Sequence, residues 1–389
     1  MIDNLLEMAS MPPERVLHIV ESLHTGAVEN WLARMYRHAH SMGILLDWTF
    51  YCQIGGVASI EDEVRDLGAK VIHSPVPLGQ KLKFVTALRA ELMQGNYDVI
   101  HCHHDLVSAV YLVASVGVPV HLRVVHVHNA DEDILTPSRL KKFFLRGPMR
   151  SVCLTLADKI VGISNHTLDT FLNGRIRQPN RDIVHYYGID AGPFIASVGD
   201  RDRFRTELGL ENNSLVLLFA GRLVPEKNPG FVLDVLQELR KLEPRVVGVF
   251  VGSGSEEQSL RSRSTAMELD KVTRFLGWRK DIPDIMSCCD WFILPRPEEP
   301  MEGFGIAVVE AQLAGLRLIL STGIPDDPLL PGSCVRRLSL SEKPLVWAQA
   351  AFSQLLETPP SRAESARVLD ESPMQMNRAL CNLLKIYKK

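Results

Sequence analysis

Short, almost wholly apolar segments rich in β-branched residues alternate along this 389-residue chain with longer amphipathic stretches. A strand that is apolar on both faces is buried on both faces, as in a parallel sheet covered by helices. The alternation therefore predicts an α/β protein with parallel sheets. The segments that we interpret as strands include residues 15–20, 97–102, 159–164, 214–221, 245–252, 290–295 and 316–321.

The stretch VENWLARMYRHAHSMG, residues 28–43, is typical of the helices predicted between the strands. Apolar residues recur in it at the spacing of one helical face, and Gly43 lies where the helix is expected to stop. The residues on that face are Trp31, Leu32, Met35, Tyr36 and Ala39.

A chain of this length is expected to form two domains. The alternation restarts after about residue 195, and residues 192–210 form a small-residue, charged connector without strand character, which places the boundary between about 192 and 202. We therefore assign residues 1–197 to a first doubly wound domain and 198–389 to a second, with the last helix a candidate for packing back on the first. In such sheets a ligand is expected at the carboxyl ends of the strands, here in a cleft between the domains.

Composition excludes several classes of protein. A net charge of -3 argues against a dedicated nucleic-acid binder, which usually has a basic domain. The seven cysteines form no C-x-x-C pair, so the sequence indicates neither a zinc nor a redox motif and fits a reducing cytosol. Acidic residues at the start replace the basic ones of a signal peptide, and no apolar run approaches the ~20 residues of a spanning helix. We expect a cytoplasmic protein.

The segment EGFGIAVVE places two carboxylates, Glu302 and Glu310, around the glycines Gly303 and Gly305. It follows the predicted strand 290–295 and leads into a predicted helix. Glycines let a ligand approach the main chain, and the free N–H groups of the first helical turn attract an anion. Helical side chains lean towards the amino end, so both carboxylates are predicted to face one pocket, where they suit the paired hydroxyls of a sugar. A tight turn with helix-favouring acids is the alternative.

A second strand-to-helix loop carries Gly221, Arg222 and Lys227 in FAGRLVPEKN. Two cations opposite a glycine-rich helix start would clamp a diphosphate and balance the charge on it as it departs. A solvated basic turn is the ordinary alternative for such a pair.

Several motifs in the same order resemble the retaining glycosyltransferases of family 4, which have the two-domain GT-B fold. Residues 302–310 match the E-x7-E signature of that family, FAGRLVPEKN its G-R-L segment, and VGSG at 251–254 its V-G-x-G segment. The first half resembles the branch that makes capsule and cell-surface polysaccharide, through YDVIHCHH, RVVHVHNA and LADKIVGIS.

The resemblance implies a role for each matching residue. Arg222 and Lys227 would hold the donor diphosphate beside Gly221, and Glu310 the ribose hydroxyls. Glu302, with the backbone of Gly303, Phe304 and Gly305, would meet the donor sugar. Gly26 would line the loop facing the phosphates, and His128 would stand near the transferred sugar. The residues expected to act in catalysis are His128, Glu302, Arg222 and Lys227.

His101, His103, His104 and His126 also crowd the predicted strand ends, which raises the hypothesis of a metal site. We predict no metal and no cofactor, because the family is metal-independent and no acidic ligands accompany the histidines at a recognised spacing. For a lone histidine such as His128 an ordinary core role at a strand end is the alternative, but its position and the family match favour the role near the sugar.

Two departures from the family pattern bear on donor or acceptor fit. The paired glycines of the first loop appear as Gly26 and Ala27, and the usual N-G-I-D appears as residues 187–190, YGID. The implied activity is transfer of a sugar from a nucleotide-diphosphate sugar to a glycan or lipid-linked acceptor in surface polysaccharide synthesis. A nucleotide-sugar 2-epimerase of the same architecture and a non-catalytic nucleotide-sugar-binding protein are the alternatives; the absence of G-x-G-x-x-G disfavours a dehydrogenase.

Residues 138–152, SRLKKFFLRGPMRSV, combine five basic residues with aromatic and aliphatic ones and contain no acid. Such a stretch can lie on an anionic membrane, which would place the protein at the inner face of the plasma membrane. The alternative is a helix that packs on the sheet and ends early at Gly147-Pro148.

Overall fold

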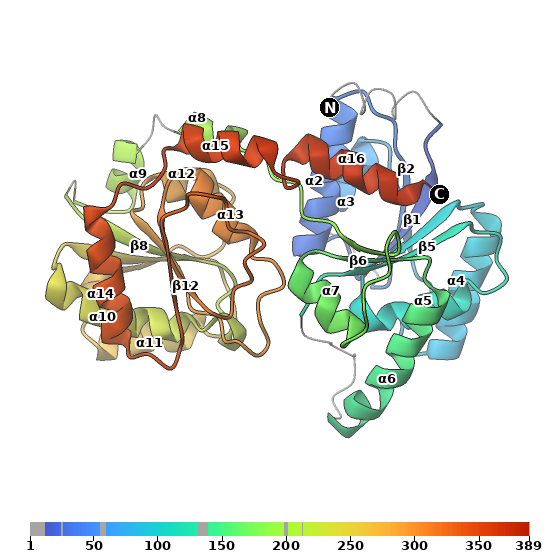
Figure 1. Ribbon diagram of the computed structural model, residues 1–389, viewed down its shortest axis with the longest axis horizontal. Coiled ribbons are helices and arrows are strands. Elements are labelled where there is room, and N and C mark those ends of the chain that lie inside the picture. The colour runs from blue at the N-terminus through green and yellow to red at the C-terminus, as the bar shows by residue number, and fades with distance from the viewer. Residues whose placement is uncertain are drawn as a thin grey trace. The chain divides into compact units, whose positions relative to one another are not determined.

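The computed structural model describes residues 12–24, 26–54, 60–130, 139–197, 201–211 and 213–388, without the side chains of 139–143 and 201. The chain forms two compact units (Figure 1). The first comprises Met1–Ile189 with Pro373–Lys389, and the second Asp190–Ser372. The division thus lies a few residues before the expected boundary at 197/198, and the last helix, α16 (Met376–Tyr387), is part of the first unit.

The first unit is built on a seven-stranded sheet with the order β3-β2-β1-β4-β5-β6-β7, in which every pairing is parallel. The order reverses direction between β1 and β4, as in a doubly wound fold. The strands are β1 (Arg15–Val20), β2 (Asp47–Cys52), β3 (Lys70–His73), β4 (Val99–Cys102), β5 (Leu122–Val127), β6 (Lys159–Gly162) and β7 (Asp182–Val184).

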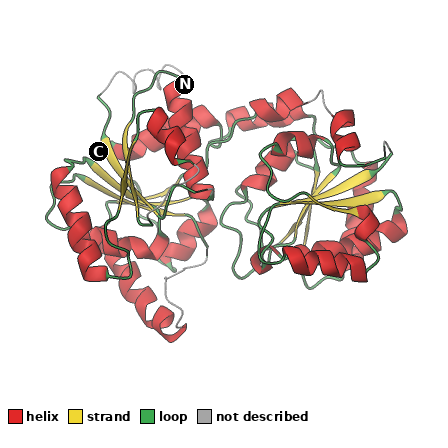
Figure 2. Ribbon diagram, turned by 180° about the vertical axis from the view of Figure 1, so that it is seen from behind, coloured by secondary structure: helices red, strands yellow, loops and turns green. Residues whose placement is uncertain are grey.

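Helices cover both faces of this sheet (Figure 2). Besides α16, they are α2 (Ala27–Ser41), α3 (Glu61–Asp66), α4 (Lys81–Gln94), α5 (Ser108–Ala114), α6 (Arg139–Leu156) and α7 (Asn165–Leu172). Alternate strand residues point to opposite faces. Leu17, Ile19, Ile100 and Cys102 join one apolar core with residues of α4, α5, α6 and α7. The residues between them face the other way, and on that side α2 packs against α16.

The second unit is built on a six-stranded, fully parallel sheet with the order β10-β9-β8-β11-β12-β13. Its strands are β8 (Leu215–Ala220), β9 (Val246–Val251), β10 (Thr273–Phe275), β11 (Trp291–Leu294), β12 (Arg317–Ser321) and β13 (Val335–Leu338). Its helices are α8 (Gly192–Ala196), α9 (Arg201–Glu207), α10 (Pro229–Leu242), α11 (Glu257–Ala266), α12 (Ile282–Ser287), α13 (Ile306–Leu313), α14 (Pro344–Ser353) and α15 (Arg362–Glu371). The predicted α/β architecture with two doubly wound sheets is confirmed.

The strongly periodic segments fold as predicted. Each of the seven apolar segments contains a strand, and the five residues expected on one face of α2 are all buried. The segments not singled out include β3, β10 and β13, which lie at sheet edges and are short and partly exposed. Edge strands carry more polar residues, so their sequence signal is weak.

Helix α6 runs through Gly147 and Pro148, so the expectation that these residues end it early is wrong. Its apolar residues Leu145, Met149, Val152 and Leu156 pack against the core of the first unit, and this packing holds the helix together across the proline. Phe144, by contrast, is 66% exposed. Over the described ranges, no helix combines the length and apolarity needed to cross a membrane.

Candidate functional site

The two motif-bearing loops of the second unit leave neighbouring strands. Strands β8 and β11 pair in the middle of the sheet, at the point where the strand order reverses. The loop after β8 carries Arg222 and Lys227, and the loop after β11 carries Glu302. Parallel strands end at the same edge of a sheet, so residues far apart in sequence meet there, where ligands of such folds bind.

Lys227 and Glu302 form a partly buried ion pair across these two loops. The Lys227 ammonium donates to Glu302 Oε2. The Lys227 side chain is 15% exposed and the Glu302 side chain 14%. Burial opposes ionisation of Glu302, but the charges of Lys227 and Arg296 outweigh it and hold the Glu302 pKa below its ordinary value. Burial also lowers the pKa of Lys227, and Glu302 offsets part of that effect.

Arg296 is a third cation at this edge, and the sequence analysis did not single it out. Its Nη1 atom lies 3.6 Å from Glu302 Oε2, and its side chain is 10% exposed. Arg222 is exposed on the β8 loop, close enough to act electrostatically on both Lys227 and Glu302. Three cations therefore surround one carboxylate, and the excess of positive charge favours an anionic ligand.

The predicted glycine-rich helix start is formed by Gly305 and α13. Gly305 is the N-cap of this helix at φ 91°, a left-handed conformation that residues with a Cβ rarely adopt. Phe304 beside it is 1% exposed and anchors the turn in the core. The Glu302 amide donates to the Gly323 carbonyl at 2.9 Å, which fixes the main chain just before Gly303. Glu310 lies half-buried in the second turn of α13.

The V-G-S-G segment at the end of β9 explains the shape of the neighbouring loop after β8, which carries Arg222 and Lys227. A Cβ on Gly252 would lie 2.0 Å from the Gly221 carbonyl oxygen, and one on Gly254 would lie 2.3 Å from that of Leu223. The Leu223 amide donates to the Ser253 carbonyl at 2.9 Å. The two main chains thus lie in direct contact, and the glycines hold the loop with Arg222 and Lys227 against β9.

In the first unit the predicted residue His128 belongs to a buried network of histidines. His18 of β1 and His101 of β4 are paired in register, so their side chains share the face covered by α2 and α16. His103, His126 and His128 continue this group at the ends of β4 and β5. All five are buried, and the Trp31 ring of α2 packs against the last three.

Direct hydrogen bonds connect these imidazoles. His18 Nδ1 lies 3.0 Å from His103 Nε2, and His103 Nδ1 lies 3.0 Å from His128 Nε2. His128 Nδ1 contacts the Tyr187 hydroxyl at 2.8 Å. A second row joins Tyr387 of α16, His101 and His126, with distances of 2.8 and 3.1 Å. Both ring nitrogens of His128 are therefore engaged within its own unit.

The end of the first row sets the direction of its hydrogen bonds. His18 Nε2 is buried and has no hydrogen-bond partner among the described residues. An orphaned N–H is rarer in proteins than an orphaned acceptor, so His18 is best described as the Nδ1–H tautomer. His18 then donates to His103, His103 donates to His128, and His128 donates to the Tyr187 oxygen. For His128 to contact a sugar, one of these hydrogen bonds has to be exchanged.

Burial keeps the histidines neutral. It lowers the pKa of His18 and His128 to about 3, and that of His101, His103 and His126 well below the ordinary value. Two trios, His18 with His101 and His103 and His103 with His126 and His128, have ligand nitrogens within 4.8 Å of one another, as a metal site requires. In both trios, however, nitrogens already pair at the distance of a hydrogen bond.

Gly26, expected in the loop facing the phosphates, is the N-cap of α2. Its carbonyl accepts from the Asn30 side chain at 2.8 Å, and the Glu29 carboxylate lies where a Cβ of Gly26 would stand, 2.0 Å away. Burial raises the pKa of Glu29, in the first turn of α2, to about 7.

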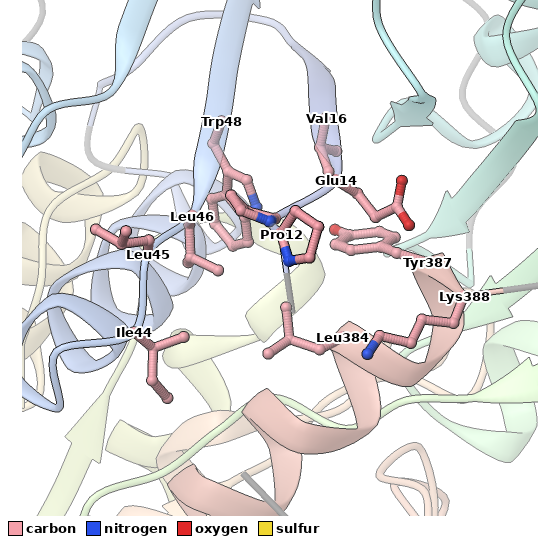
Figure 3. Close-up of a pocket in the computed structure, with 11 residues that line it drawn as sticks. Pro12, Glu14, Val16, Ile44, Leu45, Leu46, Trp48, Leu384, Tyr387 and Lys388 are labelled. Carbon is pink, nitrogen blue, oxygen red and sulfur yellow. The ribbon is translucent and has the colours of Figure 1, made fainter. Parts of the chain in front are cut away.

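A small pocket of about 30 Å³ lies at the opposite, amino end of β1 and β2 (Figure 3). It is mostly apolar and contains none of the predicted site residues. Its lining includes Val16, Ile44, Trp48, Leu384 and Tyr387.

Sequence reasoning missed Arg296, His18, His185 and the tyrosines that end the histidine rows. His18 and Arg296 adjoin motif segments, so a face-by-face reading of β1 and of the β11 loop could have found them. His185 and Tyr387 carry no local signal, because only the packing of the β7 loop and of α16 brings them to this face.

Two family descriptions match the chain: "Glycosyl transferase 4-like domain" over residues 26–188 and "Glycosyl transferases group 1" over residues 200–325. Two curated relatives are similar in sequence. The Escherichia coli UDP-Gal:alpha-D-GlcNAc-diphosphoundecaprenol alpha-1,3-galactosyltransferase is 29% identical over 272 residues, 67% of each chain. A Bacillus subtilis (strain 168) protein assigned as the glycosyltransferase EpsF is 26% identical over 381 residues, 96% of each chain.

The fold is similar to that of Anabaena HepE, solved in complex with UDP and glucose. The TM-score is 0.75 at 19% identity, covering 96% of this chain and 98% of HepE. The two family matches fall on the two units, and the pair of parallel doubly wound sheets agrees with the architecture inferred from the motifs. The chain accordingly belongs to the family 4-type glycosyltransferases with the GT-B fold.

Proposed function

We propose that this glycosyltransferase transfers a sugar, with retention of configuration, from a nucleotide-diphosphate sugar to a hydroxyl of a glycan or lipid-linked acceptor. The observation that carries the proposal is the group of three cations around Glu302 at the carboxyl ends of β8 and β11. A diphosphate is the anion that such a group suits, and the start of α13 adds main-chain N–H donors.

Within this proposal Lys227 and Arg222 bind the diphosphate and stabilise its charge as it leaves. Gly221 and the Gly303–Phe304–Gly305 turn supply main chain that a ligand can approach, and Glu310 accepts hydrogen bonds from the ribose. Glu302 faces the donor sugar once Lys227 has left this carboxylate and binds the diphosphate. His128 and Gly26 serve from the first unit, His128 near the transferred sugar.

The relatives support the choice of substrates. The E. coli protein is named for a UDP-sugar donor and a diphosphoundecaprenol-linked acceptor, and HepE was solved with UDP and glucose. EpsF matches nearly the whole chain. We therefore infer a nucleotide-sugar donor and a lipid-linked or glycan acceptor for surface polysaccharide synthesis at the cytoplasmic side of the membrane.

We further propose that no metal ion takes part in transfer, since Arg222 and Lys227 supply the positive charge that the leaving diphosphate needs.

Contact with an anionic membrane is proposed for the start of α6. From Leu145 onwards the apolar residues of this helix pack on the core, whereas Phe144 is exposed, and the sequence before it is basic. The side chains of Arg139, Lys141 and Lys142 lie outside the described residues. Co-sedimentation with anionic and neutral vesicles tests this: Lys141→Glu with Lys142→Glu should abolish a preference for anionic vesicles, and equal pelleting with both vesicles contradicts the proposal.

The function itself is tested in two steps. A panel of UDP-, GDP- and ADP-sugars is screened by thermal shift, because a donor at about 100 times its Kd stabilises the fold by about 2.7 kcal/mol. The donor that stabilises is then incubated with diphosphoprenyl-linked sugars, and the anomeric configuration of the product is read by NMR. Binding without transfer to any acceptor would favour a binding protein instead.

A further inference from the structure

Arg296 is a buried guanidinium whose donors all point to one short piece of chain. Its Nε atom donates to the Pro300 carbonyl at 3.0 Å and its Nη2 atom to the Met301 carbonyl at 3.2 Å. Its Nη1 atom faces the Glu302 carboxylate at 3.6 Å. One side chain thus contacts three consecutive residues that end at Glu302.

The strand next to β11 holds Arg296 itself in place. Ser321 at the end of β12 donates from its hydroxyl to the Arg296 carbonyl at 2.5 Å. The neighbouring Gly323 carbonyl accepts from the Glu302 amide. The loop is therefore held at one end by β12 and at the other by the turn after β12, and the Arg296 side chain spans its interior.

Of the three cations near Glu302, Lys227 and Arg296 are within ion-pair distance of its carboxylate, and they differ in what a bound donor would do to them. Lys227 comes from the β8 loop and, in the proposed function, is the group that a donor diphosphate recruits. Arg296 comes from the same loop as Glu302, and its other donors are already used by main-chain carbonyls. In the proposed function Arg222 and Lys227 both bind the diphosphate, so without Arg296 the largely buried Glu302 carboxylate would have no cation in contact, which is costly.

We propose that Arg296 is the positioning residue of Glu302, which keeps this carboxylate ionised and in place while Lys227 changes partner from Glu302 to the donor diphosphate. The proposal rests on the proposed function of the site. It also accounts for arginine at this position, because a lysine cannot donate in a planar fork to two carbonyls and face a carboxylate together.

The test compares Arg296→Met and Arg296→Lys with Arg317→Met in the full chain. Arg317 is a matched control, since it too donates to two main-chain carbonyls of the second unit, at 2.7 and 2.8 Å, but contacts no site residue. We expect Arg296→Met to lower kcat by about 10- to 100-fold, as loss of a supporting residue does elsewhere, with a smaller change in the donor KM. Arg317→Met should lower the melting temperature comparably and leave kcat nearly unchanged.

The pH dependence separates positioning from mere support of the fold. The charged groups facing Glu302 are Arg296, Lys227 and Arg222, so loss of Arg296 should move the acid limb of kcat to higher pH. In Arg296→Lys the acid limb of kcat should lie between those of wild type and Arg296→Met. A wild-type acid limb and kcat in Arg296→Met, or an equal loss in Arg317→Met, would overturn the proposal. If Arg296→Met does not fold, the Lys variant decides: an unchanged kcat and acid limb there contradicts it.

A direct titration separates this inference from the proposed function. The Glu302 carboxyl signal is assigned in 13C-labelled protein by its absence from Glu302→Gln and followed with pH in wild type and Arg296→Met, without ligand. A higher Glu302 pKa in the variant supports the positioning role even if no nucleotide sugar is turned over. An unchanged titration together with normal transfer refutes the positioning role alone.

Discussion

The two units place opposite kinds of polar group at the same point of the same fold. Each sheet reverses its order at a central pair of strands, β1 and β4 in the first unit and β8 and β11 in the second. The first buries neutral imidazoles that bond to one another, and the second buries an ionised pair with extra cations. The fold therefore provides a location, and the side chains decide whether that location holds neutral or charged groups.

The comparison separates two ways of stabilising a buried polar cluster. The histidine rows need every member uncharged, because a proton on one imidazole would be buried among like groups. Glu302 needs to stay charged, because its neighbours are cations. Acid should therefore disturb the first unit long before it disturbs the second.

The largest expected effect is acid destabilisation of the first unit. Burial lowers the pKa of His18 and His128 to about 3 and that of His104 and His185 to about 4. Their contribution is fully present above the unfolded pKa of about 6.5, where neither state is protonated, and is lost as the pH falls below it, because only the unfolded chain takes up protons. At pH 5.5 proton uptake by these four histidines in the unfolded chain should lower the free energy of unfolding by about 5 kcal/mol.

Hydrogen exchange at pH 7.5 and 5.5, corrected for intrinsic rates, measures this effect by region. Peptides of β4 and β5 should lose protection at pH 5.5, while those of β8 and β11 keep it. Replacing the exposed His24 and His40 by Gln is the control and should leave the pH response unchanged. If peptides of β8 and β11 lost protection at pH 5.5 while those of β4 and β5 kept it, the comparison would be contradicted.

The next effect concerns the charged cluster. Lys227→Ala should lower kcat at saturating donor by about 100- to 1,000-fold, because its charge acts most on the departing diphosphate. The loss in the free energy of unfolding should be smaller than the rise in the activation free energy of transfer, since Arg296 still faces Glu302. Arg222→Ala should act in the same direction. Lys241→Ala, which removes an exposed lysine paired with Glu238, should change neither. Wild-type turnover in Lys227→Ala would remove this residue from the mechanism.

Glu310→Gln should weaken donor binding by about 1.5–3 kcal/mol, the worth of a hydrogen bond to a charged group. Calorimetric titration with the nucleoside diphosphate measures it. The exposed Glu298, on the β11 loop, serves as control through Glu298→Gln. If both variants bind the nucleotide like wild type, the ribose contact lies elsewhere.

A smaller effect tests the histidine row. His103→Phe removes the central member, and the imidazoles of His18 and His128 lose the partner that lies 3.0 Å away. We expect a loss of about 1–3 kcal/mol in unfolding free energy at pH 7.5, the cost of a buried polar group without its hydrogen bond. His40→Phe is the control. A stability equal to wild type would show that the row is not a stabilising network.

The smallest effect is expected from chelation. Transfer should persist in EDTA, because in the proposed function the cations of the second unit balance the diphosphate, and the histidines of the first already bond to one another. Activity lost with EDTA and restored by one divalent cation would contradict both statements and would direct attention to the two histidine trios.

The strand ends and the motif loops could be predicted because their signals are local. A buried strand such as β8 has a continuous apolar run, and a glycine such as Gly305 marks a turn that few residues adopt. The roles of Glu302, Lys227 and His128 in catalysis stay predictions, as do those of the donor-binding residues. For His128 the structure adds a condition, because both of its ring nitrogens are already in use.

The sequence by itself determined the α/β class, the two sheets and the placement of each motif after a strand, since hydrophobic period and turn chemistry act over a few residues. Only the tertiary structure decided which strands are neighbours, and hence that Lys227 meets Glu302 and that His18 meets His103. It also decided that Arg296 points inwards and that α16 returns to the first unit. Strand order and helix docking depend on contacts between residues that are far apart in the sequence. A short stretch of sequence contains only one side of each such contact, so it cannot determine them.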